Sequence, residues 1–221
     1  MSDDLKNLGR TTQTIHAGQH VDPATGAVAP PIIQSSTFAF ADCQQGADRF
    51  AGSADGFINT RMGNPTIARL EEAVATLEGG AQGLATGSGM AALCTVAFAL
   101  LNQGDHIVGT SSVYGPSRVV MERDFSRFGV ESTFVDTSDL DALRAAIQPN
   151  TKIVFVETPA NPTIVLTDVA AAAQIAHEAG AVLLVDNTFA SPVLQRPIEM
   201  GADVVMHSMT KFINGHTDVV A

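Results

Sequence analysis

The sequence has 221 residues, of which 45% are hydrophobic and 16% are charged, and its formal net charge is −11. This composition is typical of a globular α/β protein and excludes a disordered or fibrous chain. Such an acidic chain lacks the basic face that nucleic acid or an anionic membrane would attract, so we expect neither as a partner.

The two cysteines, Cys43 and Cys94, lie far apart in the sequence and form no metal-binding or redox motif. We therefore expect a reducing compartment and no metal site. No stretch of about 20 residues is apolar throughout, and the segment Met1–Asp4 carries no basic signal region. The expected location is the cytoplasm.

Residues 1–63 show little periodicity and many turn-forming residues. A long stretch of this kind is either a disordered tail or an arm that packs on a partner. Apolar patches at Ile32-Ile33 and Phe38–Phe40 favour the arm.

From Pro65 onward the pattern becomes regular, and strand-like segments alternate with helical ones. Thr66, Ser138 and Thr167 are placed to cap helices. The expected helices span residues 66–78, 87–101, 116–128, 139–147 and 167–178, and the expected strands span 83–86, 106–110, 131–135, 152–157, 181–186 and a last segment from 203. This alternation predicts βαβ units and a mostly parallel sheet with helices on both faces.

Polar side chains follow the strands of this predicted sheet. In open parallel sheets, ligands bind beyond the carboxyl ends of the strands. The residues that we expect to converge there are Ser88, Tyr114, Glu157 with Asn161, Asp186 and Lys211.

The last two strands end in a carboxylate and a lysine, Asp186 and Lys211. A lysine after a strand is commonly a surface residue, but burial would lower its pKa and make the neutral amine nucleophilic. A strand-end Asp about two dozen residues before a strand-end Lys is the pairing that pyridoxal phosphate (PLP) requires. The Lys would form the Schiff base and the Asp would contact the pyridinium nitrogen.

The segment Gly87–Met90 opens a helix, and its glycines allow backbone N–H groups to approach an anion. Glycines before a helix are also common in ordinary turns. A helix N-terminus is nevertheless a ready phosphate site, because its amides are free and its dipole is favourable. Ser208 and Thr210 could add hydroxyl donors to the same phosphate.

Several motifs along the chain resemble one known family. They are Val185–Pro197, His207–Val220, Pro30–Phe38, Thr60–Thr66, Ser88–Met90, Tyr114-Gly115 and Glu157–Pro162. Their order and spacing resemble the Cys/Met-metabolism family of PLP-dependent enzymes. That family includes cystathionine γ-synthase, the cystathionine lyases, methionine γ-lyase and the acylhomoserine sulfhydrylases.

The resemblance implies PLP as the cofactor and the type I fold of PLP-dependent transferases. Residues 64–221 would form the PLP-binding large domain, and residues 1–63 an N-terminal arm that reaches into the neighbouring subunit's active site. A homo-oligomer, a dimer or tetramer with a shared active site, is therefore expected. Chains of the family continue into a smaller C-terminal domain, which these 221 residues do not include.

The resemblance also assigns roles to individual residues. Lys211 would form the Schiff base and move protons, Asp186 would hold the ring nitrogen, and Tyr114 would stack on the ring. Asn161 would bind the 3′-oxygen of the cofactor. The phosphate would be bound by Ser88, Gly89, Met90, Ser208 and Thr210, with Asn59 and Arg61 serving the neighbouring subunit's phosphate.

Two positions depart from the family pattern. Asn59 stands where the family usually has a tyrosine, which removes a phenol that could act as a base. Pro116 stands where methionine γ-lyases usually have cysteine.

The expected function is carbon–sulfur elimination from a sulfur amino acid, as in methionine γ-lyase or the cystathionine lyases. A γ-replacement enzyme, such as cystathionine γ-synthase or an O-acetyl- or O-succinylhomoserine sulfhydrylase, remains open. So does an inactive PLP-binding variant or fragment.

Overall fold

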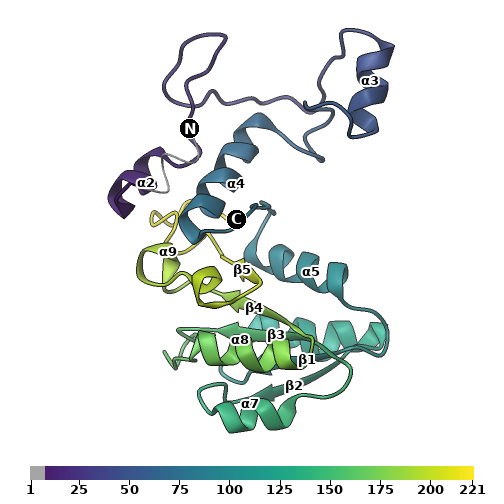
Figure 1. Cartoon of the computed structure of the whole chain (residues 1–221), viewed down its shortest axis with the longest axis vertical. Helices are drawn as coiled ribbons and strands as arrows, with labels where there is room; N and C mark the ends of the chain where they lie inside the picture. Colours follow the sequence, from purple (N-terminus) through teal and green to yellow (C-terminus); the bar gives the residue numbers. More distant parts are fainter. Residues whose placement is uncertain (1–7) are drawn as a thin grey trace. The chain divides into compact units, whose positions relative to one another are not determined.

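The computed structural model describes residues 8–221, and the Met1–Asp4 segment considered above lies outside them. The chain divides into two compact units, the first ending at Ala85 and the second running from Thr86 to Ala221. This division falls later than residue 63, the boundary expected from the sequence. Each unit is described by itself (Figure 1).

Within residues 8–85, the described part of the first unit, there are three helices, α2 (Arg10–His16), α3 (Cys43–Phe50) and α4 (Pro65–Glu78). The first two were not predicted, because seven or eight residues are too few to show a clear helical period. The N-cap of α3 is Asp42, whose side chain accepts a hydrogen bond from the backbone N–H of Gln45 at 2.8 Å.

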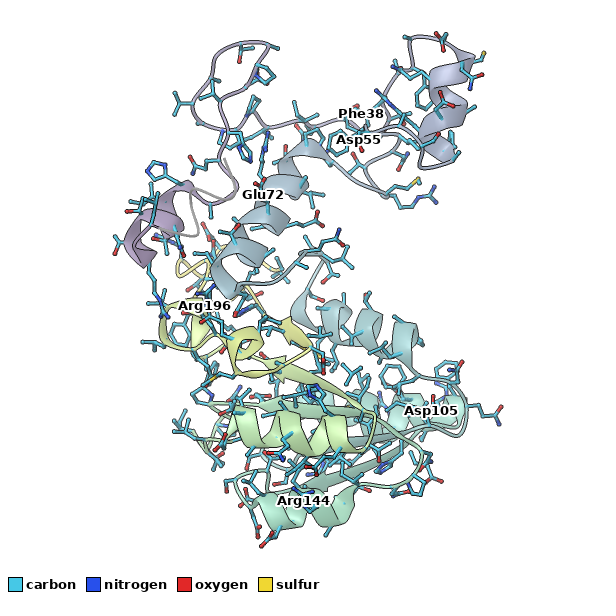
Figure 2. The ribbon with its side chains drawn as sticks, viewed as in Figure 1. Phe38, Asp55, Glu72, Asp105, Arg144 and Arg196 are labelled. Atoms are coloured by element: carbon cyan, nitrogen blue, oxygen red, sulfur yellow. The ribbon has the colours of Figure 1, made fainter. Side chains whose placement is uncertain are left out.

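The segment before α4 is tied to that helix by polar contacts. His20 lies 2.8 Å from a carboxylate oxygen of Glu72, which projects from α4 (Figure 2). Asn64, not Thr66, caps α4: its side chain accepts from the backbone N–H of Thr66 at 2.8 Å. The Thr66 hydroxyl instead accepts from the backbone N–H of Ile33 at 2.8 Å.

The strand predicted at residues 83–86 does not form. The backbone N–H of Ala85 donates to the Glu71 side chain of α4 at 2.8 Å, so this donor serves a carboxylate and not a sheet. Two predicted caps are also displaced by one residue. Asp139 and Asp168, not Ser138 and Thr167, cap their helices: Asp139 accepts two backbone N–H bonds from the first turn of its helix, and Asp168 accepts one.

The second unit is built on a five-stranded sheet in the order β2-β1-β3-β4-β5. Every neighbouring pair is parallel. The strands are β1 (His106–Thr110), β2 (Glu131–Val135), β3 (Thr151–Glu157), β4 (Val182–Asp186) and β5 (Val204–Met206). The parallel sheet expected from the alternating pattern is confirmed.

Helices cover both faces of this sheet (Figure 1). One face packs on α7 (Leu140–Ala146) and α8 (Val169–Glu178), whose outer surface carries an ion pair of 2.5 Å between Arg144 and Glu178 (Figure 2). The other face packs on α5 (Gly89–Leu100) and on the segment that follows β1. That segment, predicted as one helix, comprises α6 (Gly115–Val119), the π-helical η1 (Val120–Asp124) and the 3₁₀ helix η2 (Phe125–Phe128).

Strand β3 shows how the sequence builds this two-sided core. Val154 and Val156 face the α7–α8 side, whereas Ile153 and Phe155 face the α5 side. The side chains alternate between the two faces because a strand has a two-residue period, and all four are apolar because both faces are buried.

The short helix α9 (Ser191–Leu194) and the 3₁₀ helix η3 (Pro197–Met200) connect β4 to β5. No helix within residues 8–221 is long and apolar enough to cross a membrane.

Candidate active site

A pocket of about 180 Å³ lies at the carboxyl ends of β3, β4 and β5, beside the start of α5. Parallel strands end on the same edge of a sheet, which brings residues from distant parts of the sequence together there. All residues that line it belong to the second unit. They are Ser88, Gly89, Met90, Tyr114, Ser117, Glu157, Pro159, Asn161, Asp186, Thr188, Phe189, Met206, Ser208, Thr210, Lys211 and Val220.

Asp186 is one of two buried carboxylates that line this pocket, and only 8% of the residue is exposed. Its Oδ1 accepts hydrogen bonds from the backbone N–H of Thr188 at 3.0 Å and from the Thr188 hydroxyl at 2.5 Å. Burial raises the pKa of Asp186, while the Thr188 bonds and the charges of His207 and Lys211 act in the opposite direction. A cation placed beside this carboxylate would relieve the cost of its burial.

Thr188 also connects Asp186 to the turn that carries the lysine. Its hydroxyl oxygen accepts from the backbone N–H of Ser208 at 2.8 Å while its proton is donated to Asp186. One buried hydroxyl thus fixes both the carboxylate and the start of the turn that leads to Lys211.

The start of α5 and the Ser208 turn approach each other closely. Ser88 is the N-cap of α5, and its Oγ accepts from the backbone N–H of Ala91 at 3.1 Å. A Cβ added at Gly89 would lie 2.8 Å from the Cβ of Ser208. Only glycine permits this approach, which places a helix N-terminus and a serine hydroxyl on one wall of the pocket.

Tyr114 and Asn161 are held through their backbones by a single residue. Glu157 accepts from the N–H of Tyr114 at 2.8 Å through Oε2 and from the N–H of Asn161 at 2.7 Å through Oε1. The sequence placed Glu157 after a strand but gave it no role. Burial raises the pKa of this carboxyl to about 7, with a smaller contribution from the charge of Asp186.

Lys211 lines the pocket but is exposed, so the burial that the sequence analysis considered for it does not occur. Strand β5 ends at Met206, and the following turn brings the lysine to the solvent side of the pocket. Its candidacy therefore depends on its presence in the same pocket as Asp186 and not on desolvation. Thr210 also lines the pocket, and its hydroxyl donates to the backbone oxygen of Ala221 at 3.3 Å.

Asn59 and Arg61 belong to the first unit. The Asn59 side chain accepts from the backbone N–H of Arg61 at 2.9 Å, and the backbone of Asn59 bridges to Thr37. This hydrogen bond closes a local turn, in which the Asn59 side chain holds the backbone of Arg61. The Arg61 side chain is exposed.

The residues that the structure describes contain no cluster of three or more His, Cys, Asp or Glu side chains suited to a metal. The polar groups of the pocket are instead two buried carboxylates, those of Glu157 and Asp186, together with one amine and several hydroxyl and amide donors. This donor set suits an organic cofactor with a phosphate and a basic ring nitrogen.

Comparison with known proteins agrees with this site. The family model described as Cys/Met metabolism PLP-dependent enzyme matches residues 11–221. The chain belongs to this family. The family resemblance seen in the sequence motifs is confirmed, and so is PLP as the cofactor of the family.

Members with different reactions are about equally similar to the chain. It is 47% identical over 220 residues to an L-methionine γ-lyase of Treponema denticola, covering 99% of this chain and 55% of that relative. It is 48% identical over 212 residues to a cystathionine γ-synthase of Mycobacterium bovis, covering 96% of this chain and 53% of the relative. The chain therefore spans about half the length of these curated relatives.

The structural comparison supports the expected fold. A crystal structure described as metB from Corynebacterium glutamicum superposes with a TM-score of 0.92 and 44% sequence identity. The match covers 98% of this chain and 55% of that one. The expected fold of PLP-dependent enzymes, a parallel sheet flanked by helices, is thus confirmed.

Proposed function

We propose that this chain carries the PLP site of an enzyme that breaks the carbon–sulfur bond of a sulfur amino acid, as a methionine γ-lyase or cystathionine lyase does. The observation that carries the proposal is the meeting of Asp186, Lys211 and Tyr114 in one pocket of a chain from this family. The similarity to an L-methionine γ-lyase supports elimination as the reaction.

The pocket fits PLP at both ends of the cofactor. The close approach of Gly89 to Ser208 forms a cradle of helix N-terminal amides and hydroxyls for the phosphate, to which Ser88, Met90 and Thr210 would add. Asp186 would hold the ring nitrogen, because a buried carboxylate is stabilised by a neighbouring positive charge. When bound, PLP supplies an electron sink that makes the α-proton of a substrate amino acid acidic.

Asp186 and Lys211 would divide the proton chemistry between them. The Asp186 carboxylate would keep a proton on the ring nitrogen, and the Thr188 hydroxyl, which donates to that carboxylate, would keep it oriented. The Lys211 Nζ would hold the cofactor as a Schiff base before substrate enters. Once displaced by the substrate amine, the same Nζ would carry protons between substrate carbons.

Tyr114 and Asn161 would orient the cofactor ring. Tyr114 lines the pocket and is 40% exposed, and its ring would stack on the cofactor ring. Asn161 would donate to the 3′-oxygen of the cofactor. Both are set by their backbone contacts with Glu157.

The active site is proposed to be shared in a homo-oligomer, a dimer or tetramer located in the cytoplasm. Residues 1–63 would form an arm that packs on the neighbouring subunit. The exposed guanidinium of Arg61 would bind that subunit's cofactor phosphate, and Asn59 would add an amide donor. Light scattering of the natural full-length protein should show a dimer or tetramer, and a stable monomer that retains PLP would contradict the shared site.

A γ-replacement reaction is the second candidate, and the similarity to a cystathionine γ-synthase favours it. The pocket residues serve both reactions, because both begin with removal of the α-proton. The difference lies in whether a thiol or sulfide nucleophile adds to the γ-carbon.

Product analysis of the PLP-loaded full-length protein separates the candidates. Release of a ketoacid and ammonia from methionine or cystathionine would support the lyase. Formation of homocysteine from an acylhomoserine and sulfide, or of cystathionine when cysteine replaces sulfide, would support replacement. Bound PLP with neither activity would refute both reactions and identify an inactive PLP-binding variant.

A further inference from the structure

We infer that Glu157 is a positioning residue of this site, whose carboxylate ties together the two loops that present Tyr114 and Asn161 to the cofactor. The inference rests on the proposed PLP-dependent function and adds a residue to its machinery. Glu157 itself would act through the two residues that it holds.

The position of Glu157 follows from the register of the sheet. It is the last residue of β3 and pairs with Asp186, the last residue of β4. Phe155 and Leu184, two residues earlier in each strand, pack on the α5 side of the sheet. Because strand side chains alternate, both carboxylates point to this same side, and both line the pocket.

The two oxygens of Glu157 serve two different loops. Oε2 accepts from the N–H of Tyr114, in the loop after β1, and Oε1 accepts from the N–H of Asn161, in the loop after β3. These donors lie 43 and 4 positions away in the sequence. A single side chain therefore sets the spacing between two loops that the sheet alone would leave independent.

A carboxylate is the side chain that this position requires. Glutamine has one acceptor oxygen, and its NH₂ group would oppose the second N–H. Aspartate keeps both oxygens, but its side chain is one methylene shorter, so its oxygens would lie farther from the two N–H groups. Burying a carboxylate beside Asp186 is unfavourable, as the raised pKa of Glu157 shows, and the two N–H bonds oppose that cost.

The test compares Glu157→Gln with wild type in the full-length, PLP-loaded protein. Visible circular dichroism of bound PLP reports the orientation of the ring independently of turnover. We expect the variant to lose at least about half of this signal at equal PLP occupancy. We also expect its PLP dissociation constant to rise about ten-fold, equivalent to about 1.4 kcal/mol.

Asp203→Asn provides a matched control. Asp203 also accepts a backbone N–H, that of Leu183 at 2.8 Å, and contacts His177, but it does not line the pocket. This variant should lose stability while keeping the dichroism of bound PLP. Equal dichroism loss in both variants would overturn the positioning role, because it would reflect general destabilisation.

A second measurement needs no variant. Hydrogen exchange of the wild-type protein should show slow exchange for the amides of both Tyr114 and Asn161, and fast exchange at either would overturn the inference even if Glu157→Gln did not fold. Wild-type dichroism in Glu157→Gln would also overturn it. Wild-type protein that fails to bind PLP would instead refute the proposed function.

Discussion

Gly89 and Ser208 lie so close together that no side chain fits between them: a Cβ at Gly89 would lie 2.8 Å from Ser208 Cβ and 3.1 Å from Ser208 Cα. The two residues belong to the start of α5 and to the turn after β5, the segments proposed to bind the cofactor phosphate. Neither neighbouring atom is the end of a flexible side chain, so an added methyl group must displace backbone.

Gly89→Ala should therefore weaken PLP binding by about ten-fold or more, or about 1.4 kcal/mol. Overpacking of this kind typically also costs about 1–3 kcal/mol of folding free energy. Gly87→Ala is the control, because a Cβ there meets nothing within 4 Å. Titration of apo-protein with PLP measures the effect, and equal affinity of the two variants would contradict the cradle.

Thr188→Val should destabilise the protein and loosen the cofactor. The substitution removes the hydroxyl that donates to Asp186 and leaves the partly buried backbone N–H of Ser208 without its acceptor. The expected loss is about 1–3 kcal/mol in the free energy of unfolding. Thr188→Ser keeps the hydroxyl and should retain most of the stability in urea denaturation. If the serine variant is as unstable as the valine variant, the hydroxyl contributes nothing.

Much of the second unit could be predicted from the sequence, because apolar runs that alternate with helical periods specify a parallel sheet. That topology alone predicts that residues after different strands meet. Tyr114, Asn161 and Asp186 do meet at the pocket, although their roles there remain predictions.

Other features depended on contacts that a linear pattern does not contain. The role of Glu157 arises from a loop 43 positions away. The exposure of Lys211 depends on the path of a turn after β5 has ended. Residues 83–86 have strand-like composition, but their backbone is engaged by a side chain of α4.

Lys211 should be the residue that holds PLP covalently. Borohydride reduction of the PLP-loaded protein fixes a Schiff base as a stable amine, and peptide mapping by mass spectrometry then locates it. We expect the label on Lys211 and a loss of the visible absorption of bound PLP in Lys211→Ala. Lys152→Ala is the control, because Lys152 is an exposed residue of β3 outside the pocket lining. A label that persists elsewhere in Lys211→Ala would refute the assignment.

Asp186→Ala should leave PLP bound but slow removal of the substrate α-proton. Without the carboxylate, the ring nitrogen loses the group that keeps it protonated. A contact of about 3–4 kcal/mol in the transition state corresponds to a reduction of roughly 10²–10³-fold. Exchange of the α-proton in D₂O, followed by NMR, measures this step directly. Wild-type exchange in the variant would show that Asp186 is not part of the chemistry.

Glu157 should make the PLP-free full-length protein less stable as the pH rises. Its folded pKa of about 7 lies above the ordinary value of 4.5, so the folded state binds more protons than the unfolded state between these values. The stability contributed by the neutral acid is therefore fully present below about pH 4.5 and falls as the pH rises to about 7. Since one pKa unit corresponds to about 1.4 kcal/mol, the expected loss is about 3 kcal/mol. Urea denaturation at pH 5 and pH 8 should show the stability of wild type falling relative to that of Glu157→Gln, whose side chain cannot titrate.

The raised pKa of Asp186 makes the stability of both proteins fall with rising pH, so its contribution largely cancels in the comparison. A stability difference between the two proteins that does not change with pH would show that Glu157 does not titrate in this range.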